Sequence, residues 1–244
     1  MKDKTGCLYA VGVGPGDPQL MTLKAVRILG EVNMVAYFAK RGGVGRARKT
    51  ADFALSGNQE EIPLVYPVTT EIPSNDPRYI ALIGDFFETA AYQLAGHLEA
   101  GRDVAVLCEG DPLFYGSFLH LHVRLAQRFT CRVIPGITSM SGCWANANVP
   151  MVWGTDVLTV LPGTLDERDL VTRLKGTDAA VIMKLGSNLP KVCNALAEAG
   201  LTSRAIYVEL GTTAAERIIP LKELSVASAP YFSLILVPSE ASRS

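Results

Sequence analysis

The chain's first predicted strand and the turn behind it read LYAVGVGPGDP from Leu8 to Pro18. The apolar run from Leu8 to Val13 predicts a buried strand. The glycines after it let the backbone adopt positive φ or approach a ligand closely. A dinucleotide fingerprint would need a glycine where Asp17 stands, and Pro15 removes an amide that a phosphate site would use. The stretch therefore indicates a strand followed by a ligand-contacting or purely structural turn, with Asp17 or the next residues capping a helix.

The same alternation of strand-like and helix-like segments continues along all 244 residues. The expected strands are 8–13, 34–38, 62–66, 104–108, 131–134, 157–161, 179–183, 205–210 and 232–237. The expected helices are 20–32, 46–55, 78–100, 118–128, 167–174 and 189–199, with Gly101 ending the longest. This order is typical of α/β layers. Because the character changes after Asn146, we expect two α/β domains, residues 1–147 and 148–244.

Composition narrows the class of protein. Hydrophobic residues make up 48% and charged residues 19%, with a net charge of −1, so we expect a globular core and no nucleic-acid partner. Five cysteines and three histidines show no zinc-ligand spacing, which predicts reduced thiols and no metal. No apolar run approaches the roughly 20 residues that span a bilayer, and no signal sequence is evident. We expect a soluble, unexported, cytoplasmic protein without a membrane partner.

A second distinctive segment, CEGDPLFYGS from Cys108 to Ser117, follows the strand 104–108. Open α/β sheets bind ligands at the carboxyl ends of their strands. Glu109 and Asp111 offer carboxylates for hydroxyls or an amine, and the apolar residues offer a wall for a ring. The simpler alternative is a turn at Asp111-Pro112 with Ser117 as a helix cap.

A third segment, VIPGITSMS from Val133 to Ser141, ends a strand in Pro-Gly and opens a helix with hydroxyl residues. Capping alone explains one of its three hydroxyls.

Together the three segments resemble the tetrapyrrole methylase family, the class III S-adenosylmethionine (SAM)-dependent methyltransferases. GVGPGDP resembles the family's GxGPGD motif, EGDPLFYGS its GDP loop, and VIPGITSMSG its PGxT/S motif, in the same order and spacing. The resemblance extends over essentially the whole chain. It implies two α/β domains with SAM in the cleft between them, and a homodimer. Weaker blocks, such as VIMKLGSNLPKV and YVELGTTAAERI, are most similar to the members that methylate carbon 20 of precorrin-2 on the route to cobalamin.

The resemblance also implies a set of cofactor contacts. These are Pro15, Glu109, Gly110, Asp111, Phe114, Thr138, Ser139, Lys184 and Gly211. Many members carry glycine where this chain has Glu109, and the match near Lys184 can shift by one residue to Leu185. SAM consists of adenine, ribose and an amino-acid end. A ligand of this kind favours an apolar pocket with a few fixed polar groups.

The implied chemistry needs no protein nucleophile. The sulfonium of SAM already activates the methyl group, and the implied acceptor is an electron-rich meso carbon. Alignment of donor and acceptor and exclusion of water should supply most of the acceleration. No catalytic residue is assigned from the sequence, and a base for the late loss of a proton stays unidentified.

The segment from Lys40 to Lys49 holds five basic residues among glycines. Because precorrin-2 carries many carboxylates, we expect Arg41 and Arg46 to bind the substrate. The alternative is a solvated helix start.

Other functions stay open at this point. A sister enzyme would methylate cobalt-factor II or another corrin carbon. A more distant relative acts on a protein-bound diphthamide precursor, although the basic segment argues against it. A nucleotide-dependent oxidoreductase would need the complete dinucleotide fingerprint, and a SAM sensor would bind SAM without transferring a methyl group.

Overall fold

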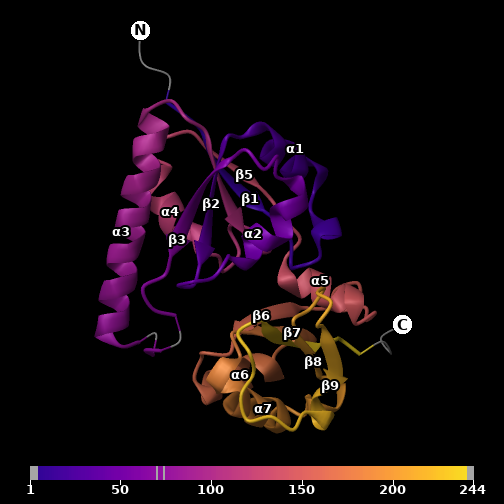
Figure 1. The fold of residues 1–244 in the computed structure, drawn as a ribbon. Helices are drawn as coiled ribbons and strands as arrows, with labels where there is room; N and C mark the ends of the chain where they lie inside the picture. The colour runs from indigo at the N-terminus through magenta and orange to yellow at the C-terminus, as the bar shows by residue number, and fades with distance from the viewer. Residues whose placement is uncertain (1–4, 70, 74, 241–244) are drawn as a thin grey trace. The chain divides into compact units, whose positions relative to one another are not determined.

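The computed structural model describes residues 5–69, 71–73 and 75–240. The chain divides into two compact units, Met1–Thr138 and Ser139–Ser244. Each unit has its own five-stranded sheet with helices packed on it (Figure 1). The α/β class expected for both halves is confirmed. The helix that begins at Ser139 belongs to the second unit, while the expected domain boundary after residue 147 stays a prediction.

The first unit is a parallel sheet with the strand order β3-β2-β4-β1-β5. Its strands are β1 (Leu8–Gly12), β2 (Met34–Ala39), β3 (Glu60–Val65), β4 (Val104–Cys108) and β5 (Cys131–Ile134). Its helices are α1 (Leu23–Glu31), α2 (Arg46–Ala51), α3 (Pro77–Glu99) and α4 (Phe118–Leu125). Every residue of β4 is buried, as expected of a central parallel strand that helices cover on both faces.

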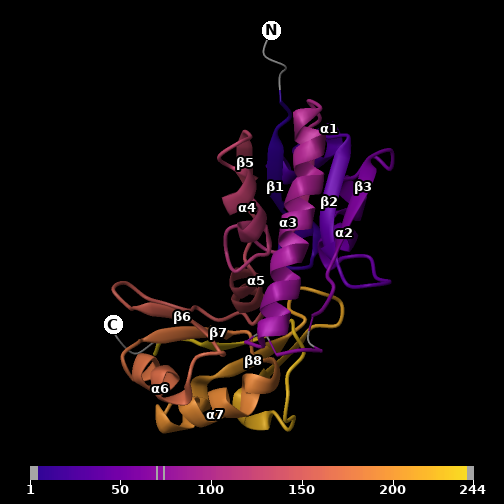
Figure 2. The same cartoon turned by 90° about the vertical axis from the view of Figure 1, so that its left-hand side faces the viewer.

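The helices of the first unit cover opposite faces of its sheet. Leu29 of α1 packs in one core with Val11 and Leu107, and α2 adds Ala47 and Ala51 to the same core. Helices α3 and α4 bury their apolar sides on the other face (Figures 1 and 2). Because the neighbouring strands β1 and β4 lead to helices on opposite faces, their carboxyl ends form the switch point where such sheets bind ligands.

Capping decides where the first helix begins. We expected it from residue 20, but it begins at Leu23 because the Thr22 hydroxyl accepts a hydrogen bond from the Ala25 amide (3.1 Å). The preceding residues Pro18–Leu20 form one turn of 3₁₀ helix, in which Asp17 accepts the Gln19 amide (2.8 Å). The expectation that Asp17 or the next residues cap a helix is therefore confirmed.

Gly84 lies inside α3, and a Cβ added there would meet nothing within 4 Å. Replacing Gly84 by alanine should stabilise the protein by about 0.5–1 kcal/mol, because alanine loses less backbone entropy in a helix. Urea unfolding would measure this as a higher midpoint. Gly101→Ala is the matched control, since Gly101 ends α3 at φ 75° and alanine is strained there. An unchanged or lower midpoint for Gly84→Ala would contradict the prediction.

The second unit has a mixed sheet with the order β6-β7-β10-β8-β9. Its strands are β6 (Leu158–Pro162), β7 (Ala179–Met183), β8 (Ile206–Glu209), β9 (Arg217–Pro220) and β10 (Ser233–Val237), and its helices are α5 (Ser139–Asn146), α6 (Glu167–Lys175) and α7 (Leu189–Glu198). Strand β10 is antiparallel to both β7 and β8, and β6 is parallel to β7. The carboxyl ends of β6, β7 and β8 therefore share one edge of the sheet.

Strand β9 was not expected from the sequence. It has four residues, includes Pro220, and pairs only with β8. An edge strand tolerates proline because one side of it needs no amide donor.

Within the part of the chain that the structure describes, no helix combines the length and apolar character needed to cross a membrane. The described residues also contain no cluster of three or more metal-ligand side chains.

Candidate functional site

Three glycines, one from each sequence motif, meet at the carboxyl ends of β1, β4 and β5. A Cβ on Gly12 would lie 2.6 Å from the Gly136 nitrogen and 2.7 Å from the Gly110 oxygen. A Cβ on Gly136 would overlap that same oxygen and lie 2.9 Å from the Gly12 Cα. These contacts are backbone against backbone, so neither glycine can be replaced without moving the main chain. The motifs, up to 124 residues apart in sequence between Gly12 and Gly136, therefore form one junction.

Hydrogen bonds fix this junction. The Val13 amide donates to the Cys108 carbonyl (2.9 Å), and the Gly110 amide donates to the Gly14 carbonyl (2.8 Å). The Asp111 carboxylate accepts the Leu113 amide (2.9 Å) and the Gly136 amide (3.2 Å). Asp111 thus shapes its own turn and also ties the GDP loop to the Pro-Gly turn.

The GDP loop presents apolar side chains beside these polar groups. Leu113 and Tyr115 are 47% and 43% exposed, and the Phe114 ring packs edge-on against the Tyr115 ring. Ser117 does not cap α4 with its side chain, which corrects one interpretation of the sequence. Its hydroxyl is instead hydrogen-bonded to the Tyr66 hydroxyl, because Tyr66, at the end of β3, reaches the same end of the sheet.

The cysteines nearest the predicted cofactor segments are not activated. Burial raises the pKa of the Cys108 thiol well above its ordinary value, and burial raises the pKa of Cys143 to about 12. The reactive form of cysteine is the thiolate, so both thiols are protonated and inert near neutral pH.

Two predicted contacts of the second unit follow β7 and β8, which run parallel to each other on either side of β10, so both lie at the same edge of the sheet. Lys184 directly follows β7, and Gly211 follows β8 by one residue. A Cβ on Gly211 would overlap the Cys143 sulfur of α5, so a larger residue there would require that side chain to shift. Leu185, the alternative position of this contact, has its side chain fully buried in the core of the second unit.

Non-glycine residues with positive φ occur in the segments that are predicted to contact the cofactor. Five non-glycine residues of the described chain have positive φ: Tyr115, Asn148, Lys184, Leu210 and Thr212. Four of them lie in the GDP loop, at Lys184 or on either side of Gly211. Such strain costs about 1–3 kcal/mol per residue and concentrates at functional sites. Sequence reasoning missed it because side chains of these types give no signal for positive φ.

The structure distinguishes the arginines of the basic segment 40–49 from one another. Arg48 donates to Asp52 (2.8 Å) and to Glu61 of β3 (2.6 Å), and its side chain is only 16% exposed. The hydrogen bond from Arg48 lowers the pKa of Glu61. Arg48 is therefore a structural residue, whereas Arg41 is exposed and Arg46 half-buried at the start of α2.

The structure therefore places the predicted contacts in both units. The first unit contains the predicted cofactor contacts Pro15, Glu109, Gly110, Asp111, Phe114 and Thr138 and the predicted substrate contacts Arg41 and Arg46. The second unit contains the predicted cofactor contacts Ser139, Lys184 and Gly211. Gly110 and Asp111 lie in the glycine junction itself, and Pro15 is next to it in sequence.

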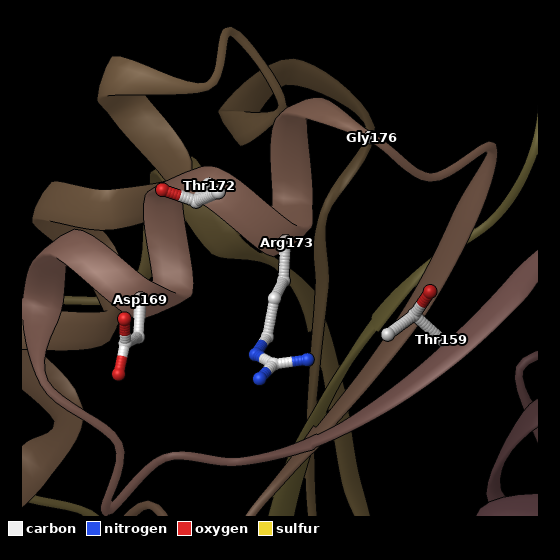
Figure 3. Close-up of a pocket in the computed structure, with 5 residues that line it drawn as sticks. All are labelled: Thr159, Asp169, Thr172, Arg173 and Gly176. Carbon is white, nitrogen blue, oxygen red and sulfur yellow. The ribbon is translucent and has the colours of Figure 1, made fainter.

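An open depression in the second unit lies away from Lys184. It is lined by Thr159 of β6, by Gly176, and by Asp169, Thr172 and Arg173 of α6, with Arg173 extended towards Thr159 (Figure 3). Thr159 and Gly176 are near the amino end of β6, opposite the edge that carries Lys184. Because Asp169 offsets the charge of Arg173 within one helical turn, this depression is a poor carboxylate site.

The chain belongs to the tetrapyrrole (corrin/porphyrin) methylases, whose family model matches residues 7–225. It is 55% identical to a precorrin-2 C(20)-methyltransferase from Sinorhizobium sp., over 96% of this chain and 95% of that protein. It is 28% identical to the cobalt-precorrin-2 C(20)-methyltransferase of Salmonella typhimurium, over 95% of this chain and 96% of that protein. The fold resembles uroporphyrin-III C-methyltransferase of Thermus thermophilus complexed with S-adenosyl homocysteine, with a TM-score of 0.66, 23% identity, and coverage of 95% and 97% of the two chains.

Proposed function

We propose that this chain methylates the C20 meso carbon of precorrin-2 to give precorrin-3A in cobalamin biosynthesis, with SAM as donor and S-adenosylhomocysteine as second product. The observation that carries the proposal is the glycine junction, which brings the three methylase motifs together at the switch point of the first sheet. The relative that is 55% identical over nearly its whole length supports the choice of acceptor.

The residues of the junction suit SAM. The GDP loop offers exposed apolar surface at Leu113 and Tyr115 beside the Asp111 carboxylate, which is the mixture that an adenosine with an amino-acid end requires. The proposed cofactor contacts are Pro15, Glu109, Gly110, Asp111, Phe114, Thr138, Ser139, Lys184 and Gly211. The strained backbone at Lys184 and around Gly211 supports a role for those two segments.

The proposed role of the protein is alignment. SAM supplies a methyl group that its sulfonium already activates. The rigid backbone at Gly12, Gly110 and Gly136 leaves the loops little freedom, so that a bound donor is held in one orientation. Apolar side chains of the GDP loop exclude water from the reacting atoms. The described thiols near the site stay protonated.

We expect Arg41→Ala and Arg46→Ala each to raise the KM for the tetrapyrrole about tenfold, because an arginine–carboxylate bond is charge-assisted. The affinity for SAM should stay within about twofold of wild type on the same reasoning. Steady-state kinetics with each substrate varied in turn would measure this. Lys191→Ala on α7 is the control, being a basic residue outside the segment. If both arginine variants keep the wild-type KM, the proposed substrate contacts are wrong.

The test of the function is a labelling experiment. Purified protein would be incubated anaerobically with methyl-labelled SAM and either precorrin-2 or cobalt-factor II. We expect label at C20 of the metal-free substrate, since the identity to the precorrin-2 enzyme is 55% and that to the cobalt-precorrin-2 enzyme only 28%. Label found only in the reaction with cobalt-factor II would show that the substrate of this enzyme is the cobalt-containing form. SAM binding without transfer to either would refute the proposed acceptor.

We also propose a cytoplasmic homodimer, on the strength of the family resemblance. Light scattering during gel filtration should give twice the chain mass of 26.2 kDa. A mass of one chain at micromolar concentration would contradict the homodimer and leave the proposed reaction untouched.

A further inference from the structure

The loop between β8 and β9 contains the predicted cofactor contact Gly211 and has a strained backbone on both sides of it. Leu210 has a φ of 51° and Thr212 a φ of 64°. Positive φ is uncommon for any residue other than glycine, and it is an outlier for a β-branched residue such as threonine. A loop in this conformation persists only where the surrounding structure holds it.

Main-chain groups hold one part of this loop. The Leu210 amide donates to the carbonyl of Phe232, directly before β10 (2.8 Å). The Leu210 carbonyl in turn accepts the amide (3.1 Å) and the hydroxyl (2.7 Å) of Thr213. These bonds fix Leu210 and Thr213, whereas Thr212 is also held by a side chain from the far end of the loop.

That side chain is Glu216, which directly precedes β9. Its Oε2 atom accepts a hydrogen bond from the Thr212 amide (2.5 Å). Thr212 is only 8% exposed, and a buried amide needs an acceptor. Glu216 therefore satisfies a buried donor and closes the turn that contains Gly211.

The same oxygen atom joins the loop to α5. The side-chain amide of Asn146, the last residue of α5, donates to Oε2 of Glu216 (2.9 Å). Helix α5 begins at Ser139, another predicted cofactor contact. Helix and loop also meet at Gly211, where a Cβ would lie 2.3 Å from the Cys143 sulfur. One oxygen of Glu216 thus links two segments of the second unit that carry predicted contacts with SAM.

We propose that Glu216 is a positioning residue for the cofactor, which holds the 210–213 turn against α5 so that Gly211 and Ser139 are presented to SAM. The inference rests on the proposed function, since it needs these two residues to contact the methyl donor, but it makes no use of the acceptor. Glu216 acts through the backbone that it holds. What it supplies is an acceptor oxygen at the correct reach, and its negative charge is secondary.

Three substitutions of Glu216 separate reach from charge. Glu216→Ala removes the acceptor and should raise the dissociation constant of SAM about tenfold, as measured by isothermal titration. Glu216→Gln keeps an amide oxygen at the same reach and should bind SAM almost as tightly as wild type. Glu216→Asp keeps the charge but is one methylene shorter, so it should weaken binding. If Glu216→Ala does not fold, the order of the Gln and Asp variants carries the same test.

Two further variants complete the comparison. Asn146→Ala breaks only the link to α5 and should raise the dissociation constant less than Glu216→Ala. In the Glu216→Ala background it should add little, because both effects pass through one oxygen atom. Glu223→Ala, at an exposed glutamate of the same unit, is the matched control. Urea unfolding of each variant gives its stability independently of SAM affinity.

Three outcomes would overturn the inference. A lowered urea midpoint with normal SAM affinity in folded Glu216→Ala would make Glu216 a purely structural residue. An equal loss of affinity in Glu216→Gln and Glu216→Ala would assign the effect to the charge. Failure of the wild-type protein to bind SAM would refute the proposed cofactor site as well. SAM binding by wild type without methyl transfer to either tetrapyrrole would refute the proposed acceptor alone, because the effect of Glu216 is read from SAM affinity.

Discussion

Gly136→Ala should lose most of its affinity for SAM. The new methyl group would overlap the Gly110 carbonyl oxygen and crowd the Gly12 Cα, and all of these atoms belong to the main chain. Relief therefore requires the GDP loop or the Pro-Gly turn to move. Overpacking costs typically about 1–3 kcal/mol, and we expect the upper end because no side chain can rotate away. If the loops move in response, SAM affinity should fall by about 100-fold.

Isothermal titration with SAM and urea unfolding would measure the two effects separately. Gly84→Ala is the matched control, because it adds the same methyl group in open space on α3 and should leave SAM binding unchanged. Gly12→Ala should resemble Gly136→Ala, since the two glycines face each other. Normal SAM affinity in the folded Gly136→Ala protein would show that the junction is not part of the cofactor site.

Asp111→Ala is expected to have the second largest effect. Its carboxylate accepts the Leu113 and Gly136 amides at once, so alanine breaks both the turn and its tie to the Pro-Gly segment. Hydrogen bonds to charged groups contribute about 1.5–3 kcal/mol each, and partial exposure reduces that value. We expect SAM affinity to fall between about tenfold and 100-fold.

Asparagine at position 111 should give an intermediate result. Its amide oxygen can replace one acceptor, but its NH₂ group cannot accept the other amide. Asp85→Ala, an exposed acidic residue of α3, serves as the control for charge alone. The role assigned to Asp111 would be wrong if Asp111→Ala bound SAM as tightly as wild type.

Much of the fold followed from local patterns. The apolar runs at β1 and β4 predicted those strands, and the segment 78–100 before Gly101 predicted α3, all within a residue or two. Boundaries that depend on a single cap were less accurate, as Thr22 shows for α1. Strand β9 escaped prediction because four residues ending in proline have no pattern of their own, and pairing with β8 makes them a strand.

The candidate site, like the fold, could be predicted from the sequence only in part. The three motifs could be found in the sequence because they resemble those of the methylase family in residue type, order and spacing. The structural role of Arg48 could not be found in the sequence, because the basic segment 40–49 contains several cations that look equivalent. Only the contacts with Glu61 of β3 and with Asp52 distinguish Arg48 from the others. The strained residues Lys184, Leu210 and Thr212 also lacked any signal in sequence.

The sequence by itself determined the α/β class, the membership of the methylase family and the segments expected to contact the cofactor, because these depend on residue type and spacing along the chain. The tertiary structure decided which main-chain atoms meet and where side chains point. Gly12, Gly110 and Gly136 come into contact only because β1 lies between β4 and β5. Contacts between distant segments are fixed by the packing of the whole sheet, and no local pattern encodes them.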